Sequence, residues 1–159
     1  MKEIKSILTP IDFSENAPII ADAAIYVAGT FKAKLSFVFV VQDFEDYTGF
    51  MTPPVNMLNL KDEIFNSAEQ QMNTFLDEKG KECSERGIPS IEGKILTGDI
   101  AEEIMQYAVT NKSDMIIMGT HGYKGFERII FGSVADKVVK NACCPVLTIN
   151  PYQDICEEK

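Results

Sequence analysis

The order of apolar segments along the chain predicts an α/β fold, with an open five-stranded parallel sheet and helices on both faces. Short apolar runs of strand length alternate with longer segments whose apolar residues recur at helical spacing. Such alternation is typical of parallel sheets joined by right-handed crossovers. The strongest strand, Leu35 to Val41 (LSFVFVV), shows no polar alternation, which indicates that both of its faces are covered.

The N-terminal segment predicts a strand, a loop and a helix. A short apolar run places the first strand near residues 3–9, and the loop after it carries Asp12. Ser14 is a favourable N-cap for the following helix, and Gly29 marks its expected end near residue 31. The apolar side chains of this helix trace one face, formed by Ala17, Ile20, Ala21, Ala24, Ile25 and Ala28.

Residues 43–60 break the alternation of strands and helices. Pro53 and Pro54 are expected to prevent a continuous helix here. The segment nevertheless contains aromatic, methionine and leucine side chains that a polar spacer would not need. We interpret it either as a lid or partner surface, or as a loop laid over the domain's own edge. A long amphipathic helix is expected after it, from about Leu60 to Arg86.

The second half of the chain predicts three more strands. The third runs from Ile91 to Leu96 and is weaker because Gly93 interrupts it, and Asp99 is a suitable cap for the helix that follows. The fourth is Met115 to Met118, and the fifth is Val146 to Ile149. We expect the strand order 3-2-1-4-5, a Rossmann-like arrangement. Ligands of such sheets bind at the carboxyl ends of the strands, where the chain reverses direction across the sheet.

Length and charge bound the classes of protein to which the chain can belong. Its 159 residues fit a single domain, expected over residues 1–150, with an acidic tail at 151–159. Hydrophobic residues make up 45% and charged residues 25%, a balance typical of soluble globular proteins. The net charge of −9 repels nucleic acid and anionic membrane surfaces, so we expect neither as a partner.

Cysteine usage and the N-terminus predict a cytoplasmic protein with reduced thiols. Cys83, Cys143, Cys144 and Cys156 form no C-x-x-C pair, and with a single histidine, His121, a His/Cys metal cluster is not expected. The first residues lack the long apolar stretch of a secretory signal. No apolar run approaches the ~20 residues that span a bilayer.

The fourth strand ends in a glycine-rich segment that suits a phosphate chain. Gly119-Thr120-His121-Gly122 follows the strand directly, and nine residues later Gly132-Ser133 opens a helix. The N–H groups at a helix start favour anionic oxygens, and glycines let the backbone approach a ligand. If the first and fourth strands are neighbours, the loop carrying Asp12 faces this segment. The alternative is a turn and a serine cap without a ligand.

The spacing Gly119-x2-Gly122-x9-Gly132-Ser133 resembles the ATP-binding signature of the universal stress protein family. The flanking sequences IIMGTHG and GSVADKVVKNACCPVLTI are similar to that family, as is the opening Thr-Pro-Ile-Asp-Phe-Ser. The segment lacks the Gly-Lys-Ser/Thr of a Walker loop and the close glycine triplet of a dinucleotide fingerprint. The resemblance covers nearly the whole chain except residues 43–60.

The resemblance implies an adenine-nucleotide site, a Mg2+ or Mn2+ ion carried by the phosphates, and a homodimer that pairs the edge strand Val146–Ile149. The implied site residues are Pro10, Ile11, Asp12 and Val40 for adenosine; Met118, Gly119, His121 and Gly122 for the ribose and first phosphates; and Gly132, Ser133 and Val134 for the distal phosphates. Plainer interpretations are a loop acid or cap partner for Asp12 and a core residue for Val40.

The function expected first is a cytosolic ATP-binding stress protein whose nucleotide state controls stability or partner choice, with slow or no hydrolysis. Efficient phosphoryl transfer would require a base and strong stabilisation of the phosphate charge by cations. His121 has no paired nucleophile or acid, so no catalytic residue is assigned, and Lys124 and Arg128 are either local phosphate contacts or solvated loop charges. The alternatives are a metal-dependent nucleotide hydrolase or adenylyl-transfer enzyme, and a nucleotide-free dimeric adaptor.

Overall fold

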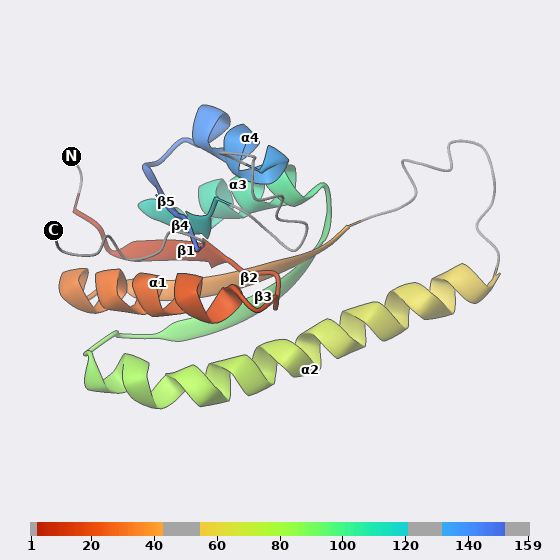
Figure 1. Cartoon of the computed structure of the whole chain (residues 1–159), viewed down its shortest axis with the longest axis horizontal. Helices are drawn as coiled ribbons and strands as arrows, with labels where there is room; N and C mark the ends of the chain where they lie inside the picture. The colour runs from red at the N-terminus through yellow and green to blue at the C-terminus, as the bar shows by residue number, and fades with distance from the viewer. Residues whose placement is uncertain (1–2, 43–54, 121–131, 152–159) are drawn as a thin grey trace, which may run out of the picture.

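The computed structural model contains a five-stranded sheet in the order β3-β2-β1-β4-β5 with every pair parallel, which confirms the predicted α/β class and strand order (Figure 1). The structure describes residues 3–42, 55–120 and 132–151, the side chains of 55–61 excepted. The elements are β1 (Ser6–Pro10), α1 (Ala17–Phe31), β2 (Lys34–Gln42), α2 (Val55–Glu85), β3 (Ile91–Gly98), α3 (Ile100–Thr110), β4 (Met115–Gly119), α4 (Ser133–Asn141) and β5 (Val146–Ile149).

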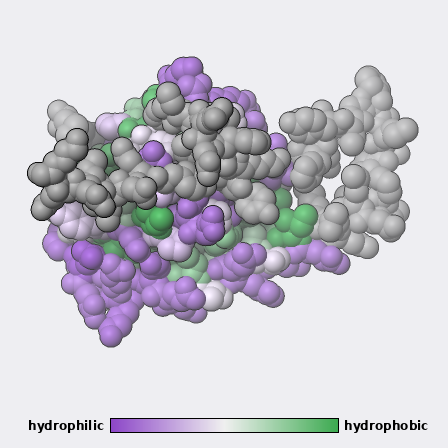
Figure 2. All heavy atoms as spheres, viewed as in Figure 1, coloured by the Kyte–Doolittle hydropathy of each residue, from purple (hydrophilic) through white to green (hydrophobic). Residues whose placement is uncertain are grey.

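Helices cover both faces of the sheet, and each face has its own apolar core. On one face α1 and α2 pack against the strands through residues such as Ile7, Ile25 and Phe37, which are fully buried. On the other face α3 and α4 cover Leu8 and Ile116. The outer side of α2 carries hydrophilic side chains along the lower edge of the view in Figure 2, as an amphipathic helix on a sheet requires.

The start of α1 differs from the sequence expectation. Asn16, not Ser14, is the N-cap, and the helix begins at Ala17 with Pro18 in its first turn. Proline is favoured there because its missing N–H is one of those that a helix start leaves unpaired anyway. Ser14 instead closes the preceding turn, since its hydroxyl accepts from the Asn16 N–H at 3.3 Å and its carbonyl accepts from the Ala17 N–H at 3.0 Å.

Helix α2 is longer than expected because it begins at Val55 rather than near Leu60. Residues 55–60 therefore belong to a helix, whereas the expectation of a lid or partner surface at 43–54 lies outside the described residues. Prolines that precede the first turn do not interrupt a helix. The first turns of α2 extend beyond the sheet, whereas its C-terminal half lies along β3 (Figure 1).

Gly93 does not interrupt β3, which continues to Gly98. A Cβ on Gly93 would lie 2.6 Å from Met72 Sδ and 2.9 Å from Leu76 Cδ1, both on α2. The glycine is therefore the point of close contact between this strand and α2, as glycines inside strands often are. On the opposite face Asp99 caps α3 as expected, since its side chain accepts from the Glu102 N–H at 2.9 Å.

Candidate functional site

The carboxyl ends of β1 and β4 lie side by side at the point where the sheet changes direction. The two strands pair in parallel, with Leu8 opposite Ile116. The loop after Pro10 and the segment after Gly119 therefore leave the sheet at the same edge. The chain builds β2 and β3 on one side of β1, and β4 and β5 on the other, so this edge is the switch point at which open α/β sheets bind ligands.

The loop after β1 holds Asp12 in an ordered turn. The Ile11 N–H donates to the Val38 carbonyl at 2.9 Å, which continues the pairing with β2 past Pro10. Asp12 is half-buried, and its Oδ1 accepts from the Ser14 N–H at 3.0 Å. Asp12 is thus a turn-forming acid, as the plainer interpretation supposed, and it also stands at the switch point. Pro10 ends β1, and Ile11 is buried between it and Asp12.

Val40 and Met118 are core residues of the face covered by α3 and α4. Val40 on β2 is 8% exposed and Met118 on β4 is 5% exposed, and both belong to the apolar cluster of that face. Their positions near the carboxyl ends of β2 and β4 place them below the same edge as Asp12. Each is held in the core whether or not it also meets a ligand.

The two flanks of the glycine motif are joined through Thr120. The Thr120 N–H donates to the Ile149 carbonyl of β5, and the Thr120 carbonyl accepts from the Gly132 N–H, each at 2.8 Å. Gly119 and Gly132 are therefore brought together at the end of β4, although the residues between them, 121–131, lie outside the described part of the chain. Thr120 is only 6% exposed.

Helix α4 begins at Ser133, with Gly132 as its N-cap. Its first intrahelical hydrogen bond joins the Asp136 N–H to the Gly132 carbonyl at 3.0 Å. The N–H groups of Ser133, Val134 and Ala135 consequently have no acceptor inside the helix. Gly132 has φ −65° and ψ 155°, torsions open to any residue, so the backbone does not require glycine there.

The lysines of α4 pair with carboxylates in the described structure. Lys137 donates to Asp99 Oδ1 and Glu102 Oε1, each at 3.2 Å, and Lys140 lies 2.8 Å from Asp136 Oδ2. The pKa of Asp99 is lowered mainly by the hydrogen bond that its carboxylate accepts from the Glu102 N–H. The pKa of Lys137 is raised mainly by its hydrogen bond to Asp99. Lys137 thus joins the middle of α4 to the start of α3, and both lysines of α4 are paired with carboxylates.

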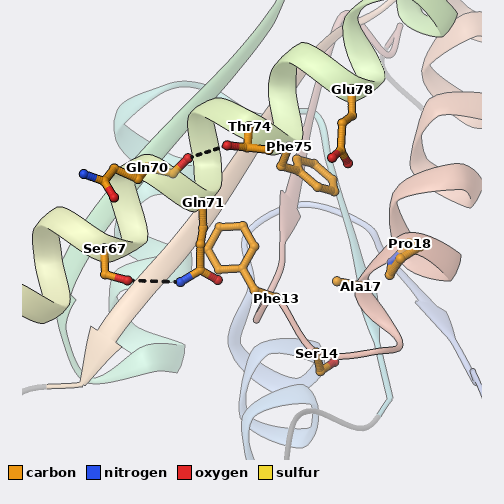
Figure 3. A pocket seen from close by; sticks show the side chains of 10 residues that line it. All are labelled: Phe13, Ser14, Ala17, Pro18, Ser67, Gln70, Gln71, Thr74, Phe75 and Glu78. Atoms are coloured by element: carbon orange, nitrogen blue, oxygen red, sulfur yellow. Dashed lines mark hydrogen bonds between the residues drawn. The ribbon is translucent and has the colours of Figure 1, made fainter.

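A surface groove of about 370 Å³ lies between the start of α1 and helix α2 (Figure 3). Phe13 and Ser14 line it from the loop, and Gln71 and Phe75 line it from α2. None of the expected nucleotide-contacting residues that the structure describes lines this groove, so the groove and those residues are separate features around the Asp12 loop.

His121 and Gly122 lie outside the described residues, as do the loop cations Lys124 and Arg128. The other expected site residues gather at the carboxyl edge of the sheet. Sequence reasoning did not assign a role to Thr120 or to Phe13, and Thr120 carried a signal, since it lies between the glycines of the motif. Within the described ranges there is no cluster of three or more His, Cys, Asp or Glu side chains able to hold a metal. The described helices also include none that is long and apolar enough to cross a membrane.

Comparison with known proteins identifies the family. The model of the universal stress protein family matches residues 3–150. The universal stress protein MJ0531 of Methanocaldococcus jannaschii is 37% identical over 145 residues, which cover 91% of this chain and 81% of that protein. The solved structure of UspA from Lactobacillus plantarum superposes with a TM-score of 0.79 at 22% identity, covering 94% of this chain and all of that one.

Two other solved relatives of the same fold carry adenine nucleotides. One is a universal stress protein in complex with cAMP, with a TM-score of 0.64, 17% identity and coverage of 94% of this chain and 99% of that chain. The other, from Archaeoglobus fulgidus, is in complex with dAMP, with a TM-score of 0.64, 20% identity and coverage of 94% and 100%. At these identities the likeness concerns the fold. With the family model spanning nearly the whole sequence, this chain belongs to the universal stress protein family.

Proposed function

We propose that this protein binds an adenine nucleotide, and ATP in particular, at the carboxyl edge of β1 and β4. We further propose that it acts as a nucleotide-dependent switch or adaptor in the cytoplasm. Asp12 and the main chain of Pro10 and Ile11 would contact adenosine, with Val40 against the base. The phosphates would lie along Gly119, His121 and Gly122 towards the start of α4, at Gly132, Ser133 and Val134.

The observation that carries this proposal is the hydrogen bond between the Gly132 N–H and the Thr120 carbonyl. It sets the N-terminus of α4 directly beside the end of β4, one strand away from the Asp12 loop. The free N–H groups of a helix start attract anionic oxygens. A carboxylate that can accept from sugar hydroxyls therefore shares one edge of the sheet with a group of donors suited to phosphate.

Two further features support the proposal. Gly132 adopts torsions that any residue can adopt, so the backbone conformation does not explain why glycine stands there. A ligand that occupies the space of a Cβ would explain it. Relatives of the same fold form complexes with cAMP and dAMP, which both contain adenosine and phosphate.

A Mg2+ or Mn2+ ion fits the site only if the nucleotide phosphates supply some of its ligands. The described residues supply no carboxylate cluster that could hold it alone. Mg2+ at nucleotide sites usually keeps several waters and takes its remaining ligands from phosphate oxygens and one or two carboxylates. When bound, the ion would neutralise phosphate charge, and we assign no catalytic residue and weak hydrolysis at most.

We also propose that the protein is a homodimer through β5. This strand is an edge of the sheet, and Leu147 is 38% exposed on it. Val139 on the neighbouring helix α4 is 44% exposed as well. An apolar edge strand without charged protection tends to pair with another chain, and a C2 dimer with antiparallel β5 strands would satisfy both copies.

Calorimetric titration with ATP and Mg2+ tests the nucleotide site. We expect Gly132→Val to abolish binding, because its side chain would occupy the space of the phosphates. Ser133→Ala should only weaken binding, by about one to two decades, since one hydroxyl hydrogen bond to a charged oxygen is lost. Gly132→Val that binds ATP as tightly as the parent would remove the main support for the proposal.

Mass spectrometry of nucleotide retained by the purified protein separates the alternatives. Retained ATP supports a binding protein, and retained ADP or AMP supports a nucleotide-hydrolysing or adenylyl-transfer enzyme. A protein that retains no nucleotide and gives no heat with ATP would support the nucleotide-free adaptor.

A further inference from the structure

Phe13, directly after Asp12, has a backbone conformation that a phenylalanine rarely adopts. Its φ is +54°, in the left-handed region. A bulky L residue is disfavoured there, and such residues persist where the surrounding structure holds them in place. The feature that holds Phe13 therefore also fixes the residues on either side of it.

The side chain of Phe13 is held by two other aromatic rings. Its ring centroid lies 5.0 Å from that of Phe39 on β2, in a tilted arrangement at 42°. It lies 6.4 Å from that of Phe75 on α2, edge to face at 74°. Phe75 is itself packed edge to face on the fully buried Phe37, at 5.0 Å and 82°. Helix α2 thus supplies one of the two rings that pack against Phe13.

The aromatic cage, formed by Phe13, Phe39 and Phe75, stands next to the turn that orients Asp12. The Ser14 N–H, on the far side of Phe13, donates to Asp12 Oδ1 at 3.0 Å. The left-handed torsion of Phe13 lies within the turn that this hydrogen bond closes, so a change of that torsion would move the N–H relative to the carboxylate. If the ring were released, Phe13 would relax towards common torsions and the turn would open.

The cage sits at the surface, where α2 can influence it. Phe13 and Phe75 face one another across the groove between the loop and α2, and Gln71 lies beside them (Figure 3). Both phenylalanines are only half-buried. The edge-to-face contact between Phe13 and Phe75 therefore links α2 directly to the residue next to Asp12.

We infer that Phe13 and Phe75 are positioning residues for Asp12, and that through them helix α2 sets the affinity of the switch-point site for the adenosine part of a nucleotide. The inference deepens the proposed function, and the part that concerns nucleotide affinity rests on that function. The part that concerns the geometry of the Asp12 turn does not, because that geometry is measurable without any nucleotide.

The test compares Phe75→Leu with Leu76→Ala. Each substitution removes three carbon atoms from a half-buried side chain of α2. Leu76 faces Gly93 of β3 rather than the loop, which makes it a matched control for loss of packing. Phe13→Leu adds a second variant, because leucine lacks the ring and, like phenylalanine, is disfavoured in the left-handed region.

The first readout is hydrogen exchange of the Ser14 amide in the nucleotide-free protein. We expect exchange to be about two- to tenfold faster in Phe75→Leu and Phe13→Leu than in Leu76→Ala, because loss of one aromatic pair corresponds to a change of this size. Equal exchange rates in Phe75→Leu and Leu76→Ala would overturn the inference. So would parent-like exchange in Phe13→Leu, since the turn would then hold without the ring.

The second readout is ATP affinity by calorimetry at a temperature where all variants are folded. We expect binding by Phe75→Leu to be about two- to tenfold weaker than binding by Leu76→Ala. If the parent protein binds ATP and both variants bind it equally, the positioning role fails while the proposed function stands. If the parent does not bind adenine nucleotides, the proposed function fails, and the exchange rates alone decide whether the aromatic cage holds the turn.

Discussion

Replacement of Gly132 by serine is expected to stabilise the fold and weaken the binding of ATP at the same time. Gly132 is the N-cap of α4, with φ −65° and ψ 155°, a conformation that serine adopts without strain. Its N–H would still donate to the Thr120 carbonyl, because that bond involves only the main chain. The new hydroxyl is placed to accept from the N–H of Val134 or Ala135, a bond typical of a serine N-cap.

The magnitudes of the two effects differ in sign and size. Serine is a better N-cap than glycine by a few tenths of a kcal/mol, so the free energy of unfolding should rise by about 0.3 kcal/mol. The new hydroxyl would accept from a backbone N–H that would otherwise donate to the distal phosphates. The new Cβ would also take up space beside those phosphates. Loss of one hydrogen bond to a charged oxygen corresponds to roughly 1.5–3 kcal/mol, or about ten- to 150-fold in affinity.

Two measurements on the parent and on Gly132→Ser decide the matter. Urea denaturation without nucleotide gives the change in stability, and calorimetric titration with ATP and Mg2+ gives the change in affinity. Unchanged affinity would refute the reasoning, because the phosphates would then not use the start of α4. A loss of affinity accompanied by a loss of several kcal/mol in stability would also contradict it, since the torsions of Gly132 predict no strain.

Three further predictions concern the rest of the fold. Asp114→Ala removes a carboxylate that accepts from the Lys5 N–H at 3.0 Å and the Ser6 N–H at 3.1 Å; urea denaturation should show about 1–3 kcal/mol lower stability, and a change below 0.5 kcal/mol would contradict this role. Leu147→Lys should halve the mass found by light scattering, from twice 17.7 kDa to a single chain, and a parent protein that is monomeric at micromolar concentration would rule out the β5 dimer. The pKa of Asp99 is lowered in the folded state, so the stability that it contributes is present above its ordinary value of 3.8 and lost as the pH falls through the lower folded value. The difference in melting temperature between the parent and Asp99→Asn should therefore close as the pH falls below 3.8, and a constant difference would refute the assignment.

The sheet could be predicted from the sequence because buried parallel strands leave a simple signal. Leu35 to Val41 is a nearly unbroken apolar run and Met115 to Met118 a continuous one, which few structures other than covered strands require. The glycine motif could be placed at a strand end and a helix start for the same reason, since the apolar run stops at Gly119 and helical spacing resumes after Ser133. The structure confirms both boundaries.

The predictions that were wrong concern positions where two local signals competed. Ser14 and Asn16 are both good N-caps, and the position of Pro18 decides in favour of Asn16. Gly93 inside a strand indicates either a break or a close approach of another backbone element, and only the packing of α2 shows that it is the second. The torsion of Phe13 leaves no mark in the sequence, since it results from ring contacts with residues far along the chain.

Two unfavourable features flank Asp12 at the end of β1, and their location is informative. Thr9 is fully buried, and its hydroxyl finds no hydrogen-bond partner among the described residues, which costs about 1–3 kcal/mol. Phe13 adds a left-handed torsion with a cost of similar order. Selection for stability alone would favour valine at the first position and glycine or asparagine at the second. Their concentration on either side of one carboxylate, at the switch point of the sheet, is what a binding site is expected to show, because strain and unsatisfied groups are tolerated where function requires a fixed geometry.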